Sequence, residues 1–208
     1  MKRIHLILTL ALGMAVVSCV HPAGDTSKTS KADIANPQRD TTQLIFWQEL
    51  QKLCGSAYSG TIVAGGENDT VFGGKSLVMH VRNCADGLIR IPFFVGADSS
   101  RTWVLTLTDQ GILLKHDHRH QDGSPDEVTM YGGHTSNFGS ATRQFFPADQ
   151  ETAEMLPAAI GNIWWIDLVP GEYFSYNLRR VNTPRLFSVR FDLVPLKEIP
   201  GAPWGWTD

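Results

Sequence analysis

A two-residue alternation of apolar and polar side chains recurs between residues 58 and 194, and it constrains the fold more than any other feature. Successive side chains of an extended strand point to opposite faces, so this alternation is typical of strands with one buried face. No alternating segment leads into a helical pattern, so we expect antiparallel strands rather than parallel ones joined by crossovers. The sequence predicts an all-β protein of about ten strands, at residues 58–64, 76–84, 88–95, 102–108, 112–118, 127–131, 143–146, 163–169, 173–180 and 186–194.

Two tight turns support this antiparallel arrangement. Residues 108–111 (TDQG) suit a type I turn that ends in a left-handed glycine, and residues 169–172 (VPGE) suit a type II turn with Pro-Gly at its centre. Ten antiparallel strands leave two exposed edges unless the sheet closes on itself. We therefore expect an up-and-down β-barrel, with a flattened sandwich as the alternative.

One helix is expected before the strands, over residues 41–53. Leu44, Trp47 and Leu50 form an apolar stripe at helical spacing, a threonine can cap the helix at its start, and a glycine can end it. A single further helical turn is expected within residues 148–160. The predicted helical content is therefore small, and residues 41–53 form the only helix of more than one turn that the sequence predicts.

The segment that joins this helix to the first strand, residues 53–60 (LCGSAYSG), resembles in its architecture the opening of calycin barrels such as lipocalins and nitrobindin-like proteins. The resemblance implies a central cavity that holds a small, often apolar, ligand. Residues 77–84 (LVMHVRNC), 100–104 (SRTWV) and 115–124 (KHDHRHQDGS) resemble an uncharacterised family of bacterial secreted proteins. That second resemblance implies no activity.

The N-terminal segment has the form of an export signal. Lys2 and Arg3 precede an apolar run at residues 4–17, which is shorter than the roughly 20 residues of a membrane-spanning helix. Residues 16–19 (VVSC) resemble the lipobox of bacterial lipoproteins, which implies cleavage of the signal peptide and acylation of Cys19. The alternative is ordinary signal cleavage nearby, with Cys19 lost or left free.

Three regions follow from this segment: a signal peptide at residues 1–18, a tether at residues 19–40 and a barrel domain at residues 41–208. The tether is polar and holds almost no large apolar residue, so we expect it to be disordered. The lipobox resemblance implies a protein of the bacterial cell envelope that contacts a membrane through Cys19. The outer membrane is favoured, because Val20 stands where an aspartate would signal retention at the inner membrane.

Cys54 and Cys84 are the two cysteines of the expected barrel domain. An even pair in an exported chain is most simply a disulfide. Two buried thiols and a metal pair are the alternatives, and no C-x-x-C spacing supports a metal. We predict a Cys54–Cys84 disulfide.

The strongest candidate for chemistry is the segment His116-x-His118-x-His120. If the strand continues through all three residues, their imidazoles share one face with Ile112 and Leu114, so that an apolar floor leads to a polar mouth. The alternative is that the strand stops earlier and the histidines lie on a solvated hairpin loop.

Two imidazoles spaced two residues apart on a strand can bind one zinc or other divalent transition-metal ion, because their rings can converge. His116, His118 and His120 are the candidate ligands on this strand. A further ligand must come from elsewhere, and His80 and His134 are the candidates.

Arginines recur on or beside the expected strands. At a barrel mouth, several could bind a carboxylate or phosphate through paired hydrogen bonds; scattered surface arginines are the alternative. They are Arg82, Arg90, Arg101, Arg179, Arg180, Arg185 and Arg190. Alternation also sends Trp164 and Trp165 to opposite faces, so one of them must meet solvent, a ligand or another element.

The sequence leaves three functional hypotheses open. The preferred one is a lipid-anchored envelope protein that binds a small molecule at the barrel mouth, with His80, Arg82, Arg101, His116, His118 and His120 as the candidate ligand-binding residues. The second is a metal-dependent enzyme built on the histidines, and the third is a structural or interaction lipoprotein. No catalytic residue is assigned, and no cofactor beyond the possible metal. The formal net charge of −3 gives no reason to expect nucleic acid as a partner.

Overall fold

The computed structural model describes residues 41–66 and 69–207. The predicted signal peptide, the predicted acylation site Cys19 and the predicted tether lie outside the described residues. Within the described ranges, no helix is long and apolar enough to cross a membrane.

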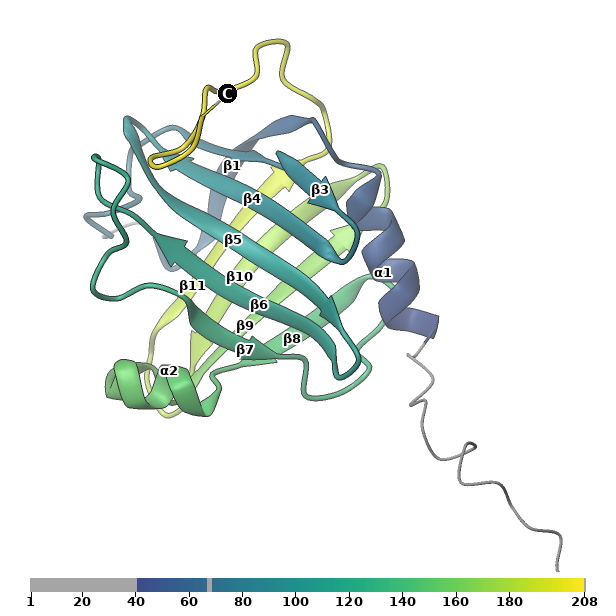
Figure 1. Cartoon of the computed structure of the whole chain (residues 1–208), viewed down its shortest axis with the longest axis vertical. Coiled ribbons are helices and arrows are strands. Elements are labelled where there is room, and N and C mark those ends of the chain that lie inside the picture. The colour runs from purple at the N-terminus through teal and green to yellow at the C-terminus, as the bar shows by residue number, and fades with distance from the viewer. Residues whose placement is uncertain (1–40, 67–68, 208) are drawn as a thin grey trace, which may run out of the picture. The chain divides into compact units, whose positions relative to one another are not determined.

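Ten antiparallel strands of the described chain form one nearly closed up-and-down barrel, and an eleventh, β3, pairs with β4 beside it (Figure 1). Each strand of the barrel pairs with the next along the chain up to β7 and again from β8 to β11, and β1 pairs with β11, so β7 and β8 are the two ends of the strand order. The strands are β1 (Ala57–Ala64), β2 (Leu77–His80), β3 (Asn83–Ala85), β4 (Leu88–Val95), β5 (Asp98–Thr108), β6 (Gly111–His118), β7 (Tyr131–His134), β8 (Arg143–Pro147), β9 (Asn162–Val169), β10 (Tyr173–Arg180) and β11 (Leu186–Asp192). The predicted all-β barrel is confirmed.

The barrel closes where β7 meets β8, through the helix that follows β8. This helix, α2 (Gln150–Met155), is capped by Asp149, whose backbone N–H donates to the Gly132 carbonyl at 2.9 Å. The Thr152 hydroxyl accepts from the Gly132 N–H at 2.7 Å and donates to its carbonyl at 2.8 Å. A Cβ on Gly133 would overlap a carbonyl oxygen of β8. The strands therefore approach more closely at this seam than a side chain allows.

The N-terminal helix α1 (Thr41–Gln51) covers one end of the barrel. Its buried stripe is Gln43, Phe46, Trp47 and Leu50, which has helical spacing, whereas the predicted stripe residue Leu44 is half-buried. A polar residue occupies the stripe because the Gln43 Nε2 donates to the Thr135 hydroxyl at 2.9 Å.

Inward-facing side chains fill the barrel next to α1. The largest of them that are fully buried are Phe46, Leu50, Met79, Ile89, Ile91, Leu105, Ile112, Leu114, Phe146, Trp164, Phe174 and Phe191. Phe46 and Leu50 come from α1, and the others come from alternate positions of the strands, as the sequence pattern predicts. The Cys54–Cys84 disulfide joins the segment after α1 to β3, with the two Cα atoms 6.2 Å apart, so that prediction is confirmed.

Three strands differ from their predicted bounds by more than two residues, and one of them, β5, begins at Asp98 and not at residue 102. The predicted strand at residues 76–84 is divided into β2 and β3. The strand predicted at residues 127–131 instead begins at Tyr131 as β7. Gly132 and Gly133 have no side chains, so the part of the chain that forms β7 carries no alternation for a pattern to detect.

Candidate functional site

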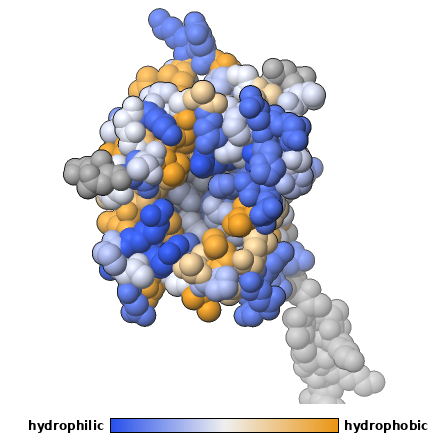
Figure 2. Space-filling model, turned by 90° about the vertical axis from the view of Figure 1, so that its left-hand side faces the viewer, coloured by the Kyte–Doolittle hydropathy of each residue, from blue (hydrophilic) through white to orange (hydrophobic). Residues whose placement is uncertain are grey.

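A cavity of about 170 Å³ opens at the end of the barrel opposite α1. Figure 2 views this end and shows the surface hollowed at its centre. We call it the mouth cavity. Seven of its lining side chains are aromatic: Phe72, Phe93, Trp103, Tyr131, Trp164, Tyr176 and Phe187.

His116 lies on β6 in the wall of the mouth cavity, buried to 3% exposure. Its Nδ1 is 2.9 Å from the Tyr131 carbonyl oxygen, which can only accept, so Nδ1 carries the proton. Its Nε2 is 2.6 Å from the Tyr176 hydroxyl and accepts from it. Burial lowers the pKa of His116 to about 3. The imidazole is therefore neutral at pH 7, and both of its nitrogens are engaged.

Stacked aromatic rings form the wall beside His116. Tyr176 stacks on Trp103 with ring centroids 4.3 Å apart and an 18° interplanar angle. Trp103 stacks in turn on Phe93 at 4.8 Å. On the neighbouring strand β7, Tyr131 stacks on His116 at 4.7 Å and 13°. The aromatic rings that line the cavity are therefore held in place by packing against one another.

His118 lies two residues further along β6, nearer the mouth. Its Nε2 is 3.1 Å from the Tyr131 hydroxyl. Burial, and then the charge of Arg101, lower the pKa of His118 to about 4. Burial also raises the pKa of the Tyr131 phenol to about 12. Both groups are uncharged at neutral pH.

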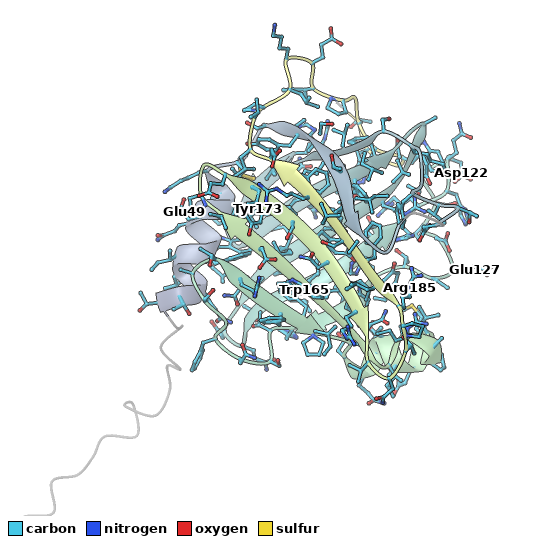
Figure 3. All side chains as sticks on the ribbon, turned by 180° about the vertical axis from the view of Figure 1, so that it is seen from behind. Glu49, Asp122, Glu127, Trp165, Tyr173 and Arg185 are labelled. Carbon is cyan, nitrogen blue, oxygen red and sulfur yellow. A yellow bond between two sulfur atoms is a disulfide. The ribbon has the colours of Figure 1, made fainter. Side chains whose placement is uncertain are left out.

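Among the described residues of the lining, the full charges are those of three arginines, Arg101, Arg180 and Arg185, which we call the rim arginines. Arg101 forms an ion pair with Asp98. Arg180 Nε donates to the Asn162 side-chain carbonyl at 2.8 Å. Arg185 is exposed at the turn between β10 and β11 (Figure 3), and within the described residues its guanidinium makes no hydrogen bond or ion pair. Within residues 41–66 and 69–207, no aspartate or glutamate lines the cavity.

The structure brings three of the six candidate ligand-binding residues together. Arg101, His116 and His118 line the mouth cavity, and His80, Arg82 and His120 do not. His80 alternates with a core residue on β2 and so points away from the barrel interior. The Arg82 guanidinium donates to a carbonyl near the C-terminus, that of Thr207, at 3.0 Å.

The expectation that all three imidazoles of the His-x-His-x-His segment share one face is wrong for His120. β6 ends at His118, and His120 is exposed in the loop that follows. The chain turns there, because the Gly123 N–H donates to the His120 carbonyl at 2.9 Å and Gly123 has a positive φ of 87°. The alternation of residue types continues past the point where the strand stops.

The candidate metal ligands do not gather at one point. Over the described ranges, no group of three or more histidine, cysteine, aspartate or glutamate side chains is placed to hold a metal ion. His134, the other candidate ligand, pairs with Leu113 toward the α1 end of β6, away from His118. His116 would have to give up its bond to Tyr176 before Nε2 could bind a metal.

Sequence reasoning missed the tyrosines of the cavity. Tyr131 and Tyr176 come from β7 and β10, and they contact His116 from two different strands. Alternation alone places Tyr176 inside the barrel. Its distance to β6 depends on strand order and register, which no residue pattern in one sequence reports.

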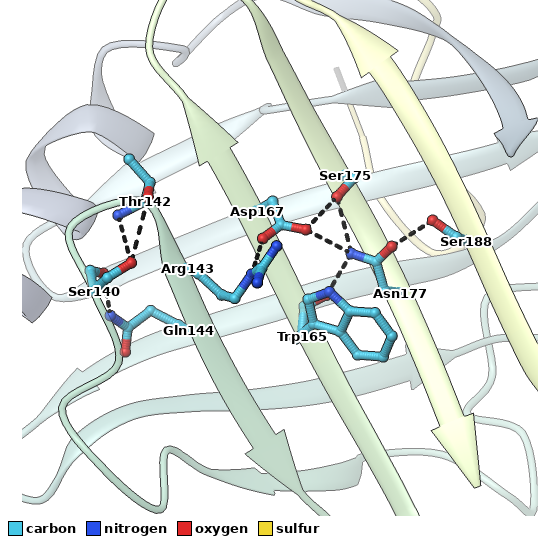
Figure 4. Close-up of polar contacts among 9 residues, drawn as sticks. All are labelled: Ser140, Thr142, Arg143, Gln144, Trp165, Asp167, Ser175, Asn177 and Ser188. Carbon is cyan, nitrogen blue, oxygen red and sulfur yellow. Dashed lines mark hydrogen bonds and ion pairs between the residues drawn. The ribbon is translucent and has the colours of Figure 1, made fainter. Parts of the chain in front are cut away.

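A second polar group lies on the outer face of β8–β11 (Figure 4). Ser175 donates to the Asp167 carboxylate at 3.0 Å, and Asn177 Nδ2 donates to the Ser175 hydroxyl at 2.9 Å. Arg143 pairs with Asp167, and Ser188 donates to Asn177. These groups satisfy one another, so the network stabilises the sheet and presents few open hydrogen-bonding positions.

No protein-family model matches the chain, and neither a curated protein nor a solved structure matches it. The fold and the site define it as a ten-stranded barrel with a small aromatic cavity, rimmed by cations, at one end.

Proposed function

We propose that this protein is a lipid-anchored protein of the bacterial envelope that binds a small molecule in the mouth cavity. The observation that carries the proposal is the cavity itself, about 170 Å³ in volume, with aromatic walls and three arginines at its rim. Ligand sites are commonly apolar hollows with a few polar groups that fix orientation, and barrel mouths are one of the places where they occur.

The hydrogen bonds around the cavity support binding by a preformed site. His116 is held by Tyr131 and Tyr176, and His118 is held by Tyr131. Side chains fixed in this way lose little further conformational freedom when a ligand arrives, which favours affinity. Because the imidazoles of His116 and His118 are neutral, the lining around them is uncharged, and the apolar part of a ligand can enter without displacing an ion.

Two observations support export. The first 19 residues have the pattern of a lipoprotein signal. The Cys54–Cys84 disulfide fits an oxidising compartment outside the cytoplasm.

The binding proposal is tested with a panel of neutral, anionic and cationic single-ring and short-chain compounds. We expect at least one of them to shift the NMR signals of residues that line the mouth cavity. Leu178→Trp, which adds bulk on the inner face of β10, should abolish those shifts. Arg179→Trp, on the neighbouring outward position, is the matched control and should leave them unchanged. A panel that produces no shift at millimolar concentration would contradict the proposal.

A further inference from the structure

We infer that the ligand of the mouth cavity is a single-ring aromatic carboxylate, with its ring between the aromatic walls and its carboxylate at the rim arginines. This inference rests on the proposed function, because it names the chemical class that the same cavity takes. The volume of the mouth cavity, its aromatic lining and the charge of that lining each narrow the chemical class of the ligand.

The volume limits the ligand to about one ring. A cavity of about 150 Å³ lined by apolar side chains binds benzene, whereas drug-sized ligands occupy about 300–1,000 Å³. The mouth cavity measures about 170 Å³. It therefore accepts one six-membered ring, and it is too small for a long acyl chain or a fused multi-ring compound.

The aromatic side chains of the lining favour a ligand with an aromatic ring over one with an alkyl group. The Trp103 ring is stacked nearly parallel to the Tyr176 ring, at 18°, and to the Phe93 ring, at 19°. On another side, the His116 and Tyr131 rings lie within 13° of parallel. An aromatic ring that enters among these side chains can stack on one ring or meet the edge of another, and such ring pairs contribute about 0.5–1.5 kcal/mol beyond their buried area.

The charge of the lining calls for an anion. Of the described residues, three guanidinium groups and no carboxylate line the cavity. Arg101 is paired with Asp98, but Arg180 is bonded only to a neutral amide oxygen, and Arg185 has no partner among the described residues. The two imidazoles are neutral and cannot supply further positive charge. A carboxylate at the rim would meet a planar guanidinium with two donors facing it.

The position of the charge matches the dimensions of such a ligand. The rim arginines come from β5, the end of β10 and the β10–β11 turn, at the open end of the barrel. Of the stacked rings, Trp103 and Tyr176 lie on inward positions of β5 and β10. A ring that enters first therefore leaves its carboxylate at the rim, and the exposed Arg185 can turn toward it (Figure 3).

The test uses the full-length protein in detergent at pH 7, titrated with benzoate and followed by calorimetry and NMR. Three compounds of similar size serve as controls: cyclohexanecarboxylate keeps the charge without the aromatic ring, benzyl alcohol keeps the ring without the charge, and benzylamine reverses the charge. We expect benzoate to bind about tenfold more tightly than benzyl alcohol and roughly three- to tenfold more tightly than cyclohexanecarboxylate, with no binding of benzylamine.

The variant Arg185→Ala tests the contribution of the rim arginines to affinity separately from that of the aromatic lining. Its side chain is exposed, so the barrel should fold normally. We expect the Kd for benzoate to rise about tenfold and the Kd for benzyl alcohol to stay the same. Arg179→Ala, an exposed arginine that faces outward from β10, is the matched control and should change neither Kd.

The outcomes distinguish this inference from the proposed function. Equal affinity for benzoate and benzyl alcohol, or for benzoate and cyclohexanecarboxylate, would overturn the ligand class while small-molecule binding stands. Tighter binding of phenyl phosphate than of benzoate would also overturn it, in favour of an aryl phosphate. Benzoate binding that persists in Leu178→Trp would place the site outside the cavity and reject the inference. If no compound shifts a cavity residue, the proposed function fails as well.

Discussion

At the residue scale, His116 is the clearest case of a side chain whose chemistry is set by its surroundings. A histidine in water is half-protonated near pH 6.5, but this ring is buried and its Nε2 accepts a hydrogen bond from Tyr176. Protonation would place a donor against that hydroxyl and a charge inside the barrel. The residue that first suggested a metal ligand therefore acts as a neutral part of an aromatic wall.

The buried histidines predict that acid weakens the fold. The pKa of His116 falls from 6.5 in the unfolded chain to about 3 in the folded protein, and that of His118 to about 4. Below about pH 6.5 the unfolded chain therefore binds protons that the folded protein does not, so the free energy of unfolding falls as the pH falls. We expect the Tm to decrease steadily between pH 7 and pH 4.5.

The pH range of this effect distinguishes the contribution of the histidines to stability from that of the carboxylates. The lowered pKa values of Asp98 and Asp149 stabilise the fold above about pH 4, and that contribution is lost only at lower pH. His116→Gln cannot be protonated and should reduce the slope of Tm against pH, whatever its Tm at pH 7. His120→Gln removes an exposed histidine and should leave the slope unchanged. An unaltered slope in His116→Gln would refute this account.

At the element scale, the strands whose bounds could be predicted are those with bulky, alternating side chains. β10 runs from Tyr173 to Arg180, as the pattern predicts, because each inward position carries a large side chain. β7 was misplaced, because glycines occupy its centre. Alternation likewise placed His116 and His118 inside the barrel, but it could not show that the strand stops before His120.

The glycine seam of β7 yields a prediction of its own. Gly133→Ala would force a methyl group against a carbonyl oxygen of β8, so the strands must separate or shift. Overpacking of this kind typically costs about 1–3 kcal/mol. We expect the free energy of unfolding, measured in urea, to fall by about that amount.

Gly201→Ala is the matched control, since a Cβ there meets open space. It should change the free energy of unfolding by less than about 0.5 kcal/mol. Equal stability of the two variants would mean that the β7–β8 approach is looser than described.

At the scale of the whole molecule, the two ends of the barrel have separate roles. The described chain begins at α1, where Thr42 donates to the Phe138 carbonyl in the loop between β7 and β8. The mouth cavity opens at the other end, beside His118. The N-terminus of the barrel domain is therefore remote from the mouth, and anchoring through Cys19 would not require any residue of the cavity.

This separation predicts that membrane attachment and ligand binding can be lost independently. Cys19→Ala removes the sulfur that would be acylated, so we expect the protein to move from the membrane fraction to the soluble fraction. Ser18→Ala keeps a small residue before Cys19 and should stay membrane-bound. The released Cys19→Ala protein should bind benzoate with the Kd of the wild type, because the cavity is built entirely from residues of the barrel domain. Membrane fractionation of Cys19→Ala that matches the wild type would refute the anchor. Release with loss of binding would show instead that the cavity depends on the N-terminal segment.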